Sequence, residues 1–203
     1  MPTLTIDGQE ITVADGTRII DAADELGIEI PRFCYHKGLS VAANCRMCLV
    51  EIEGAPKLVP SCHETCRDGM TVLTDSPRVL ESRRAVLEYI LLNHPVDCPI
   101  CDQAGECDLQ DQYFDHDHQP SRHSFRKRHK VKAKVIGPHI ILDGERCINC
   151  TRCVRFSEEV AKAPQLRQVN RGEETFVDVF PGKELDHPYS MCCADVCPVG
   201  ALT

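Results

Sequence analysis

The first residues of the chain alternate apolar and polar side chains around a central Asp7-Gly8 pair. The apolar positions on the two sides of this pair are Leu4, Ile6, Ile11 and Val13. Alternate side chains of a strand point to the same face, and Asp-Gly favours a two-residue turn. The pattern therefore predicts a β-hairpin over residues 3–13.

The next segment has the spacing of a helix. Apolar side chains recur every three or four residues over 17–26, and Gly27 is placed to end the helix. Two apolar runs, 47–53 and 56–60, then predict strands joined at Gly54. The order strand, strand, helix, strand indicates a small α+β roll of the β-grasp type.

A second, longer helix is predicted further along the chain. Ser76 is a favourable N-cap and Pro77 a favourable first helical residue. An apolar stripe follows as far as Leu91, and Pro95 is expected to stop the helix just after His94. His94 is therefore predicted to lie on the rigid end of a helix.

The rest of the chain has weaker patterns. Residues 95–120 read as a loop, 139–143 as a short strand, and 154–160 as a helix. Together the patterns predict three parts, which span residues 1–78, 79–119 and 120–203.

Composition narrows the class of protein. The 203 residues are 42% apolar, which is typical of a globular chain, and the net charge of −8 does not favour nucleic-acid binding. The first residues do not resemble a secretory signal, and no apolar run is long enough to span a bilayer. We therefore expect a cytoplasmic chain without direct membrane insertion, in which the 14 cysteines are reduced thiols or metal ligands.

The first cysteine group has the spacing C-x10-C-x2-C-x13-C. Its members are Cys34, Cys45, Cys48 and Cys62. Two thiolates separated by two residues can bind one centre from a tight loop, and the other two complete a four-ligand cage. Spacing alone also allows a structural zinc site.

The second group combines a histidine with three cysteines. The spacing H-x3-C-x2-C-x5-C joins His94, Cys98, Cys101 and Cys107. A neutral imidazole in place of a thiolate removes one negative charge and should raise the reduction potential of a cluster. Taken alone, this group also allows a Cys3His zinc site.

The third group is the most specific. Cys147, Cys150 and Cys153 follow the ferredoxin pattern C-x2-C-x2-C, and Cys197-Pro198 is the usual completing partner for a [4Fe–4S] cluster. Three cysteines remain, Cys66, Cys192 and Cys193, and we assign none of them as a ligand because an isolated cysteine is more often a small buried hydrophobe.

A basic run between residues 122 and 134 contains seven arginines and lysines. Such a run is usually a solvated connector, and the alternatives are a docking strip for an acidic partner or a cover for an anionic cluster. The chain has no glycine-rich phosphate loop and no visible nucleophile–base pair, so it has no evident catalytic residues of its own.

The three groups together resemble one known family, the N-terminal half of the large iron–sulfur subunit of respiratory complex I, called the 75 kDa subunit. The same module recurs in the small diaphorase subunit of NAD-linked hydrogenases and in some formate dehydrogenases. The stretches that carry the resemblance are 34–36, 45–51, 94–111, 147–156 and 197–202. Family members of complex I continue beyond the last stretch, so this chain, which stops at Thr203, is expected to be a fragment, a split subunit or a short member.

The resemblance implies a ligand role for each group. It implies one [2Fe–2S] cluster on the first group and one [4Fe–4S] cluster on each of the other two. It also implies a [2Fe–2S] ferredoxin-like domain, a His/Cys3 cluster segment and a [4Fe–4S] ferredoxin-like domain, in that order.

The resemblance further implies a function. The chain is expected to relay single electrons from a flavin-containing NADH-oxidising subunit, through a downstream iron–sulfur subunit, toward quinone. It would lie peripherally on the cytoplasmic face of the membrane within a complex. The alternatives are the equivalent subunit of a soluble NAD-linked hydrogenase or formate dehydrogenase and, in another class, a non-redox zinc scaffold.

Overall fold

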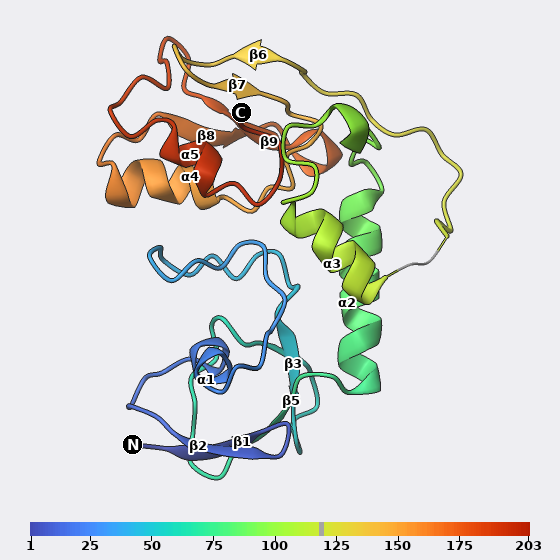
Figure 1. Ribbon diagram of the computed structural model, residues 1–203, viewed down its shortest axis with the longest axis vertical. Helices are drawn as coiled ribbons and strands as arrows, with labels where there is room; N and C mark the ends of the chain where they lie inside the picture. The colour runs from blue at the N-terminus through green and yellow to red at the C-terminus, as the bar shows by residue number, and fades with distance from the viewer. Residues whose placement is uncertain (118–119) are drawn as a thin grey trace. The chain divides into compact units, whose positions relative to one another are not determined.

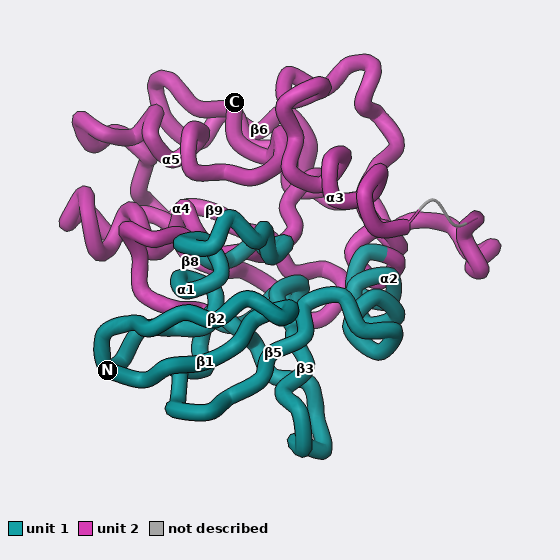
Figure 2. Tube along the Cα trace, turned by 60° about the horizontal axis from the view of Figure 1, so that its bottom comes forward, with its two compact units in different colours: residues 1–35, 43–87 teal, residues 36–42, 88–203 magenta. Residues whose placement is uncertain are grey.

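The computed structural model describes residues 1–117 and 120–203, which form two compact units (Figure 1, Figure 2). The first unit contains residues 1–35 and 43–87, and the second contains residues 36–42 and 88–203. The predicted boundary at residue 119 lies outside the described residues. Among the described residues, every helix is too short or too polar to cross a bilayer.

The first unit begins with the predicted hairpin. Strands β1 (Thr3–Ile6) and β2 (Gln9–Thr12) pair antiparallel, with Ile6 opposite Gln9. Asp7 and Gly8 have φ angles of 46° and 80°, so both turn residues adopt the left-handed conformation that matches the twist of a two-residue hairpin. The predicted hairpin is confirmed.

A mixed five-stranded sheet completes the first unit. Its other elements are α1 (Ile19–Glu25), β3 (Leu49–Ile52), β4 (Val59–Pro60) and β5 (Thr71–Leu73), and the strand order is β2-β1-β5-β3-β4. The central strand β5 pairs parallel with β1 and antiparallel with β3. Strand β5 was not predicted, because three residues are too few to show a period.

The core of the first unit is mainly aliphatic and draws on the sheet, α1 and the loop that follows α1. Its fully buried side chains include Leu4, Ile6, Ile19, Ile20, Ile30, Phe33, Val50 and Val72. Burying a side chain of this size contributes about 1.5–3 kcal/mol, so the aliphatic side chains alone give this unit a substantial core, in which the predicted ligands Cys34, Cys48 and Cys62 are also buried.

The long helix α2 (Pro77–Leu91) starts where the sequence predicts. The Ser76 hydroxyl accepts a hydrogen bond from the Val79 amide at 3.4 Å, which is the contact of an N-cap. The prediction that the helix continues to His94 is wrong. The helix ends at Leu91, and His94 lies in the turn that follows.

Two contacts explain the early end of α2. The Lys127 ammonium donates to the carbonyl oxygens of Leu91 at 2.5 Å and Leu92 at 3.2 Å, which satisfies groups that have no partner within the helix. Pro95 also disfavours the helical conformation at the residue before it, so His94 cannot extend the helix.

The segment predicted as a loop over residues 95–120 contains two helical elements. A 3-10 turn, η1, covers Cys98–Ile100, and α3 covers Asp108–His116. The helix was missed because it is polar on most sides and buries only Leu109. Asp108 and Asp111 in its first turn favour the helix through its dipole.

The remainder of the second unit consists of short elements. Strands β6 (Lys134–Val135) and β7 (Ile141–Leu142) pair antiparallel, as do β8 (Leu166–Val169) and β9 (Phe176–Val179), which are joined through the short turn η3 (Gly172–Glu174). The predicted helix over 154–160 begins earlier, as α4 (Arg152–Arg155), and continues as the π-helical turn η2 (Phe156–Val160). The last helix, α5 (Cys192–Asp195), packs against α4 (Figure 1).

The C-terminal segment pairs with β7 and closes the second unit. The Ile141 amide donates to the Thr203 carbonyl at 2.7 Å, and the Asp143 amide donates to the Ala201 carbonyl at 2.8 Å. These bonds hold the segment that follows Cys197 beside the segment that precedes Cys147.

Candidate metal centres

The four cysteines of the first group meet in the first unit. Cys34, Cys48 and Cys62 are buried, and Cys45 is half-buried. The Cys34 sulfur is hydrogen-bonded to the thiols of Cys45 and Cys62, and Cys62 is also hydrogen-bonded to Cys48. The structure therefore brings together all four residues that the spacing selects.

The thiols of the first group strongly perturb one another. Hydrogen bonds from Cys45 and Cys62 hold the pKa of Cys34 well below its ordinary value, and the same contacts raise the pKa of Cys45 and of Cys62. One thiolate is thus stabilised by neighbours that keep their protons. Four thiolates at this separation would repel one another, so ligation by all four requires a strongly positive centre between them.

The third group lies around a single cavity in the second unit. Cys147, Cys150, Cys153 and Cys197 all line a cavity with about 310 Å³ of empty space, part of which opens to solvent. The apolar side chains of Leu142, Val177 and Val199 line it as well. The four residues of the most specific sequence motif therefore share one site, although Cys197 is far from the others in the sequence.

Burial raises the pKa of these thiols, and backbone amides that point at the sulfur lower it. Burial raises the pKa of Cys150 to about 12 and that of Cys197 to about 11. The amides of Val199, Ala201 and Leu202 point at the Cys197 sulfur and favour its thiolate. Amide donors aimed at a ligating sulfur stabilise negative charge on a cluster and tune its reduction potential.

The loops that carry the ligands adopt an unusual backbone conformation. Arg46, between Cys45 and Cys48, has a φ angle of 62°, and Asn149 and Thr151, in the third group, have φ angles of 57° and 61°. A left-handed residue among right-handed ones turns successive amides toward one point and creates a concave anion site. Since Arg46 and Thr151 are not glycine, this strain gave no clear signal in the sequence.

The second group lies after the end of α2. Cys107 is the N-cap of α3, and the amides of Leu109 and Gln110 point at its sulfur. Cys101 lies near Cys107, and His94 and Cys98 precede this pair in the sequence.

The environment of His94 fits a metal ligand. Its Nδ1 atom is buried and has no hydrogen-bond partner among the described residues. Burial lowers the pKa of the imidazole to about 4, so the ring is neutral at pH 7. A neutral imidazole with a free nitrogen is the form that binds metals.

The donor sets of all three sites fit iron–sulfur clusters, because each offers four sulfur or imidazole ligands. Among residues 1–117 and 120–203, no group of three or more Cys, His, Asp or Glu side chains is spaced to hold one metal ion. The third group instead lines a shared cavity, and the thiols of the first group are hydrogen-bonded to one another.

Three family models match the chain. The 2Fe–2S iron–sulfur cluster binding domain matches residues 1–77, the iron–sulfur binding region of NADH-ubiquinone oxidoreductase-G matches 83–122, and the ferredoxin-like domain of NADH-quinone oxidoreductase subunit 3 matches 137–203. The NADH-ubiquinone oxidoreductase 75 kDa subunit of Reclinomonas americana is 48% identical over 203 residues, which are 100% of this chain and 29% of that protein.

Two further similar proteins agree with this match. The mitochondrial NADH-ubiquinone oxidoreductase 78 kDa subunit of Neurospora crassa is 47% identical over 201 residues, which are 98% of this chain and 27% of that protein. A chain in the crystal structure of an NAD+-reducing [NiFe]-hydrogenase in the H2-reduced state is 30% identical with a TM-score of 0.87, over 100% of this chain and 86% of that one.

The chain belongs to the family of the N-terminal iron–sulfur module of the 75 kDa subunit of NADH-quinone oxidoreductase. It spans 29% of the length of the Reclinomonas relative and 27% of the Neurospora one. It contains 2Fe–2S and 4Fe–4S binding domains. The resemblance drawn from the cysteine motifs is confirmed.

The cysteines left unassigned by their spacing have different environments. Cys66 and Cys193 are buried, and burial raises the pKa of Cys66 to about 11 and that of Cys193 to about 12. Both environments fit small core side chains, and Cys193 belongs to the core of the second unit. Cys192 is half-buried.

The basic run of residues 122–134 is an irregular and mostly exposed strap, as a connector would be. Its cations nevertheless bind acids of this same chain: Arg122 pairs with Glu88, Arg128 with Glu173, Lys132 with Asp97, Asp143 and Glu145, and Lys134 with Asp178. Intramolecular pairing therefore accounts for most of this charge.

Proposed function

We propose that this chain is an electron-transfer module that holds one [2Fe–2S] cluster and two [4Fe–4S] clusters. The [2Fe–2S] ligands are Cys34, Cys45, Cys48 and Cys62. The ligands of one [4Fe–4S] cluster are His94, Cys98, Cys101 and Cys107, and those of the other are Cys147, Cys150, Cys153 and Cys197. The observation that carries the proposal is the third site, where four thiols line one cavity.

The shape of that cavity favours a cluster over a single zinc ion. Zinc takes four ligands at about 2.3 Å, which leaves no empty space between them. Four sulfurs that line one cavity among apolar side chains, with amides aimed at Cys197, suit a larger anionic core instead. We therefore favour the electron-transfer function over a zinc scaffold.

Bound clusters would supply reversible one-electron chemistry. The residues of the chain would set how easily that electron is accepted. A neutral His94 contributes no negative charge, so the second site should be easier to reduce than a site with four thiolates. Amides at Cys197 and Cys107 stabilise added negative charge, and apolar lining such as Leu142 limits the access of water.

We also propose the finer architecture. A β-grasp fold for the first domain is supported by the mixed sheet with α1 between its strand pairs. A division into residues 1–78, 79–119 and 120–203 is supported by the family models, whose three spans follow the same order.

Within a complex, the chain would relay electrons from a flavin-containing NADH-oxidising subunit, through a downstream iron–sulfur subunit, toward quinone. The names of its relatives support this assignment, as does their identity of 47–48% to this chain. Such a complex would place the chain peripherally on the cytoplasmic face of the membrane. The hydrogenase chain supports a second candidate, a module that exchanges electrons within a soluble NAD+-linked hydrogenase.

The first test is the iron and acid-labile sulfide content of anaerobically purified chain, with optical and EPR spectra before and after dithionite. We expect about ten iron atoms per chain, as two plus four plus four, and a brown colour that bleaches on reduction. A colourless protein with about three zinc ions would contradict the proposal.

A second test separates the two complexes. The tagged chain is expressed in its native host, and the proteins that purify with it are identified. Recovery with quinone-reducing membrane subunits supports the first candidate, and recovery with a nickel-containing subunit supports the second.

A further inference from the structure

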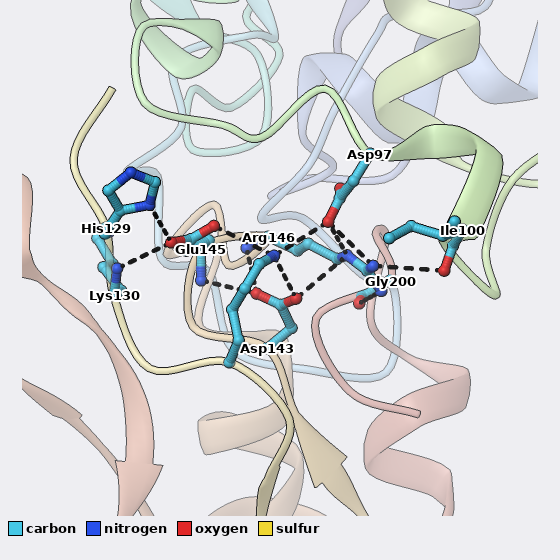
Figure 3. Close-up of polar contacts among 9 residues, drawn as sticks. Asp97, Ile100, His129, Lys130, Asp143, Glu145, Arg146 and Gly200 are labelled. Carbon is cyan, nitrogen blue, oxygen red and sulfur yellow. Dashed lines mark hydrogen bonds and ion pairs between the residues drawn. The ribbon is translucent and has the colours of Figure 1, made fainter. Parts of the chain in front are cut away.

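One ion pair joins the second ligand group to the third. Asp97 directly precedes Cys98, and Arg146 directly precedes Cys147. The Arg146 Nη2 and Nε atoms lie 3.1 Å and 3.3 Å from the same Asp97 Oδ2 atom (Figure 3). The two side chains are only 11% and 18% exposed.

The same guanidinium also binds the backbone of both ligand loops. Arg146 donates to the Gly200 carbonyl at 3.4 Å and to the Ile100 carbonyl at 3.5 Å (Figure 3). Gly200 follows Cys197, and Ile100 lies between Cys98 and Cys101. One side chain therefore contacts loops of both the second and the third group, at a place that we call the junction of the two groups. The planar guanidinium suits this role because it can donate hydrogen bonds to several acceptors at once.

Neighbouring charges hold the pair in place. The Asp143 Oδ1 atom accepts hydrogen bonds from the amides of Glu145 at 3.0 Å and Arg146 at 3.2 Å, which fixes the turn before Cys147. The Lys132 ammonium lies 3.0 Å from Asp97 and 2.8 Å from Asp143. This cluster keeps both members of the pair partnered, as partly buried charges require.

Close steric contact at the same junction leaves little room for the two loops to move. A Cβ atom at Gly200 would collide with the Cys101 sulfur and lie 3.2 Å from the Gln103 Cβ. The Asp108 amide donates to the Pro198 carbonyl at 3.1 Å. The segment after Cys197 thus packs directly on the loop of the second group, so a small displacement of either loop moves ligands of both groups.

We propose that Asp97 and Arg146 are a positioning pair that fixes the ligands of the second group relative to those of the third. The inference rests on the proposed function, because it concerns the separation of two clusters in one relay. It adds a role for two residues that are not ligands.

The test is a double-mutant cycle on the full chain, with Asp97→Asn, Arg146→Gln and the double variant. Amide hydrogen exchange is measured at Ile100 and Cys101, whose amides donate to the carbonyls of Asp97 and Cys98 at 2.9 Å and 3.1 Å. Each single variant should speed exchange there about tenfold, and the double variant should add little to either, because one interaction is lost in all three.

A matched control is Arg128→Gln, which removes an exposed arginine paired with Glu173. It should leave exchange at Ile100 and Cys101 unchanged. Fully additive effects of Asp97→Asn and Arg146→Gln would overturn the proposal. The same increase in exchange across β8 and β9 would also overturn it, because that result indicates general loss of stability.

EPR of the reduced, iron-loaded variants gives an independent readout. Loss of a cation and loss of an anion should shift the reduction potentials in opposite directions. Loss of a positioning pair should instead change the magnetic interaction between the two clusters in the same way in both variants. Arg146→Lys keeps the positive charge but loses the planar guanidinium with its several donors. It should reproduce the change in magnetic interaction with little shift in reduction potential. An unchanged interaction in all three variants would overturn the proposal.

These outcomes are separable from failure of the proposed function. A wild-type chain that binds zinc in place of iron would contradict the electron-transfer role, yet its metal-bound second unit would still allow the exchange measurement to test the pair. A chain with a full complement of iron and additive exchange effects would retain its function and lose the positioning pair.

Discussion

The two units place their candidate ligands differently with respect to the hydrophobic core. In the first unit, the sheet and α1 enclose many aliphatic side chains, such as Ile6, Ile20 and Val72, and the buried thiols of the first group are a minority of this core. In the second unit, Cys153 is itself a member of the core, and Cys147 and Cys197 pack against it.

This difference implies different dependence on the metal. A core of aliphatic side chains contributes its free energy whether or not a cluster is bound. A core whose members are ligands loses its centre when the ligands have nothing to bind, as in small domains that fold only with metal. The first unit should therefore tolerate loss of its cluster, and the second should not.

The largest expected effect is the replacement of a core ligand in the second unit. Cys153→Ala should remove about four iron atoms and abolish slow amide exchange in β8 and β9, because the substitution removes a core side chain and a cluster together. Exchange in β1 and β5 of the first unit should stay slow.

Cys192→Ala is the matched control, since Cys192 is half-buried and is not assigned as a ligand. It should leave both iron content and exchange unchanged. If Cys153→Ala leaves β8 and β9 protected, the core of the second unit does not depend on its cluster.

The next effect concerns the first unit. Ile6 is fully buried, and Ile6→Ala should lower the free energy of unfolding of this unit by about 2–5 kcal/mol, through lost burial and the cavity that remains. Exchange-detected denaturation would show β1 and β5 opening at lower denaturant while β8 and β9 open as before. An equal shift of the denaturation midpoint in both units would mean that they unfold together. Their stabilities would then not differ in dependence on the metal.

Sequence reasoning succeeded where one local signal decided the outcome. The Asp7-Gly8 hairpin and the Ser76 N-cap are both short-range features. The cysteines selected by spacing in the first and third groups also lie close together in the fold, and their role as ligands stays a prediction.

The rest depended on contacts between distant residues. Strand β5 forms because β1 and β3 flank it, and the end of α2 is set by Lys127, which lies 36 residues after Leu91. The Asp97–Arg146 pair joins residues 49 apart in the sequence. No pattern within a window of a few residues contains such contacts, and so the junction between the second and third ligand groups emerged only from the fold.

A smaller effect should follow from crowding at that junction. Gly200→Ala would place a methyl group against the Cys101 sulfur, closer than van der Waals contact allows, so the loop of the second group must shift. We expect a loss of about 1–3 kcal/mol in the second unit and an altered EPR signal from the second group, with the [2Fe–2S] signal of the first unit unchanged.

Gly54→Ala serves as the control for the loss of a glycine. Gly54 has a φ angle of 79°, and a Cβ atom there would have no neighbour within 4 Å among the described residues, so its replacement strains the backbone without crowding a ligand. It should weaken the first unit modestly and leave every cluster signal in place. An unaltered second-group signal in Gly200→Ala would show that the Cys101 loop adapts freely.

The smallest effect tests the first unit by pH. A hydrogen bond from Ser76 and the charge-assisted bond from Arg78 lower the pKa of the Glu51 carboxyl below its ordinary value of 4.5. A carboxyl with a lowered pKa stabilises the folded unit above that ordinary value, and the contribution is lost as the pH falls through the folded-state pKa. The denaturation midpoint of β1 and β5 should therefore be higher in the wild type than in Glu51→Gln at pH 7, and the difference should shrink toward pH 4. Glu53→Gln, at an exposed position two residues away, serves as the matched control for loss of a carboxylate.

Removal of iron turns the same pH measurement into a test of the contrast between the units. The contacts of Glu51 with Ser76 and Arg78 involve no candidate ligand. The difference between wild type and Glu51→Gln should therefore be the same with and without iron, because a unit that is stable without its cluster keeps these contacts. A difference that disappears when iron is removed would show that the sheet needs its cluster, as the second unit is expected to.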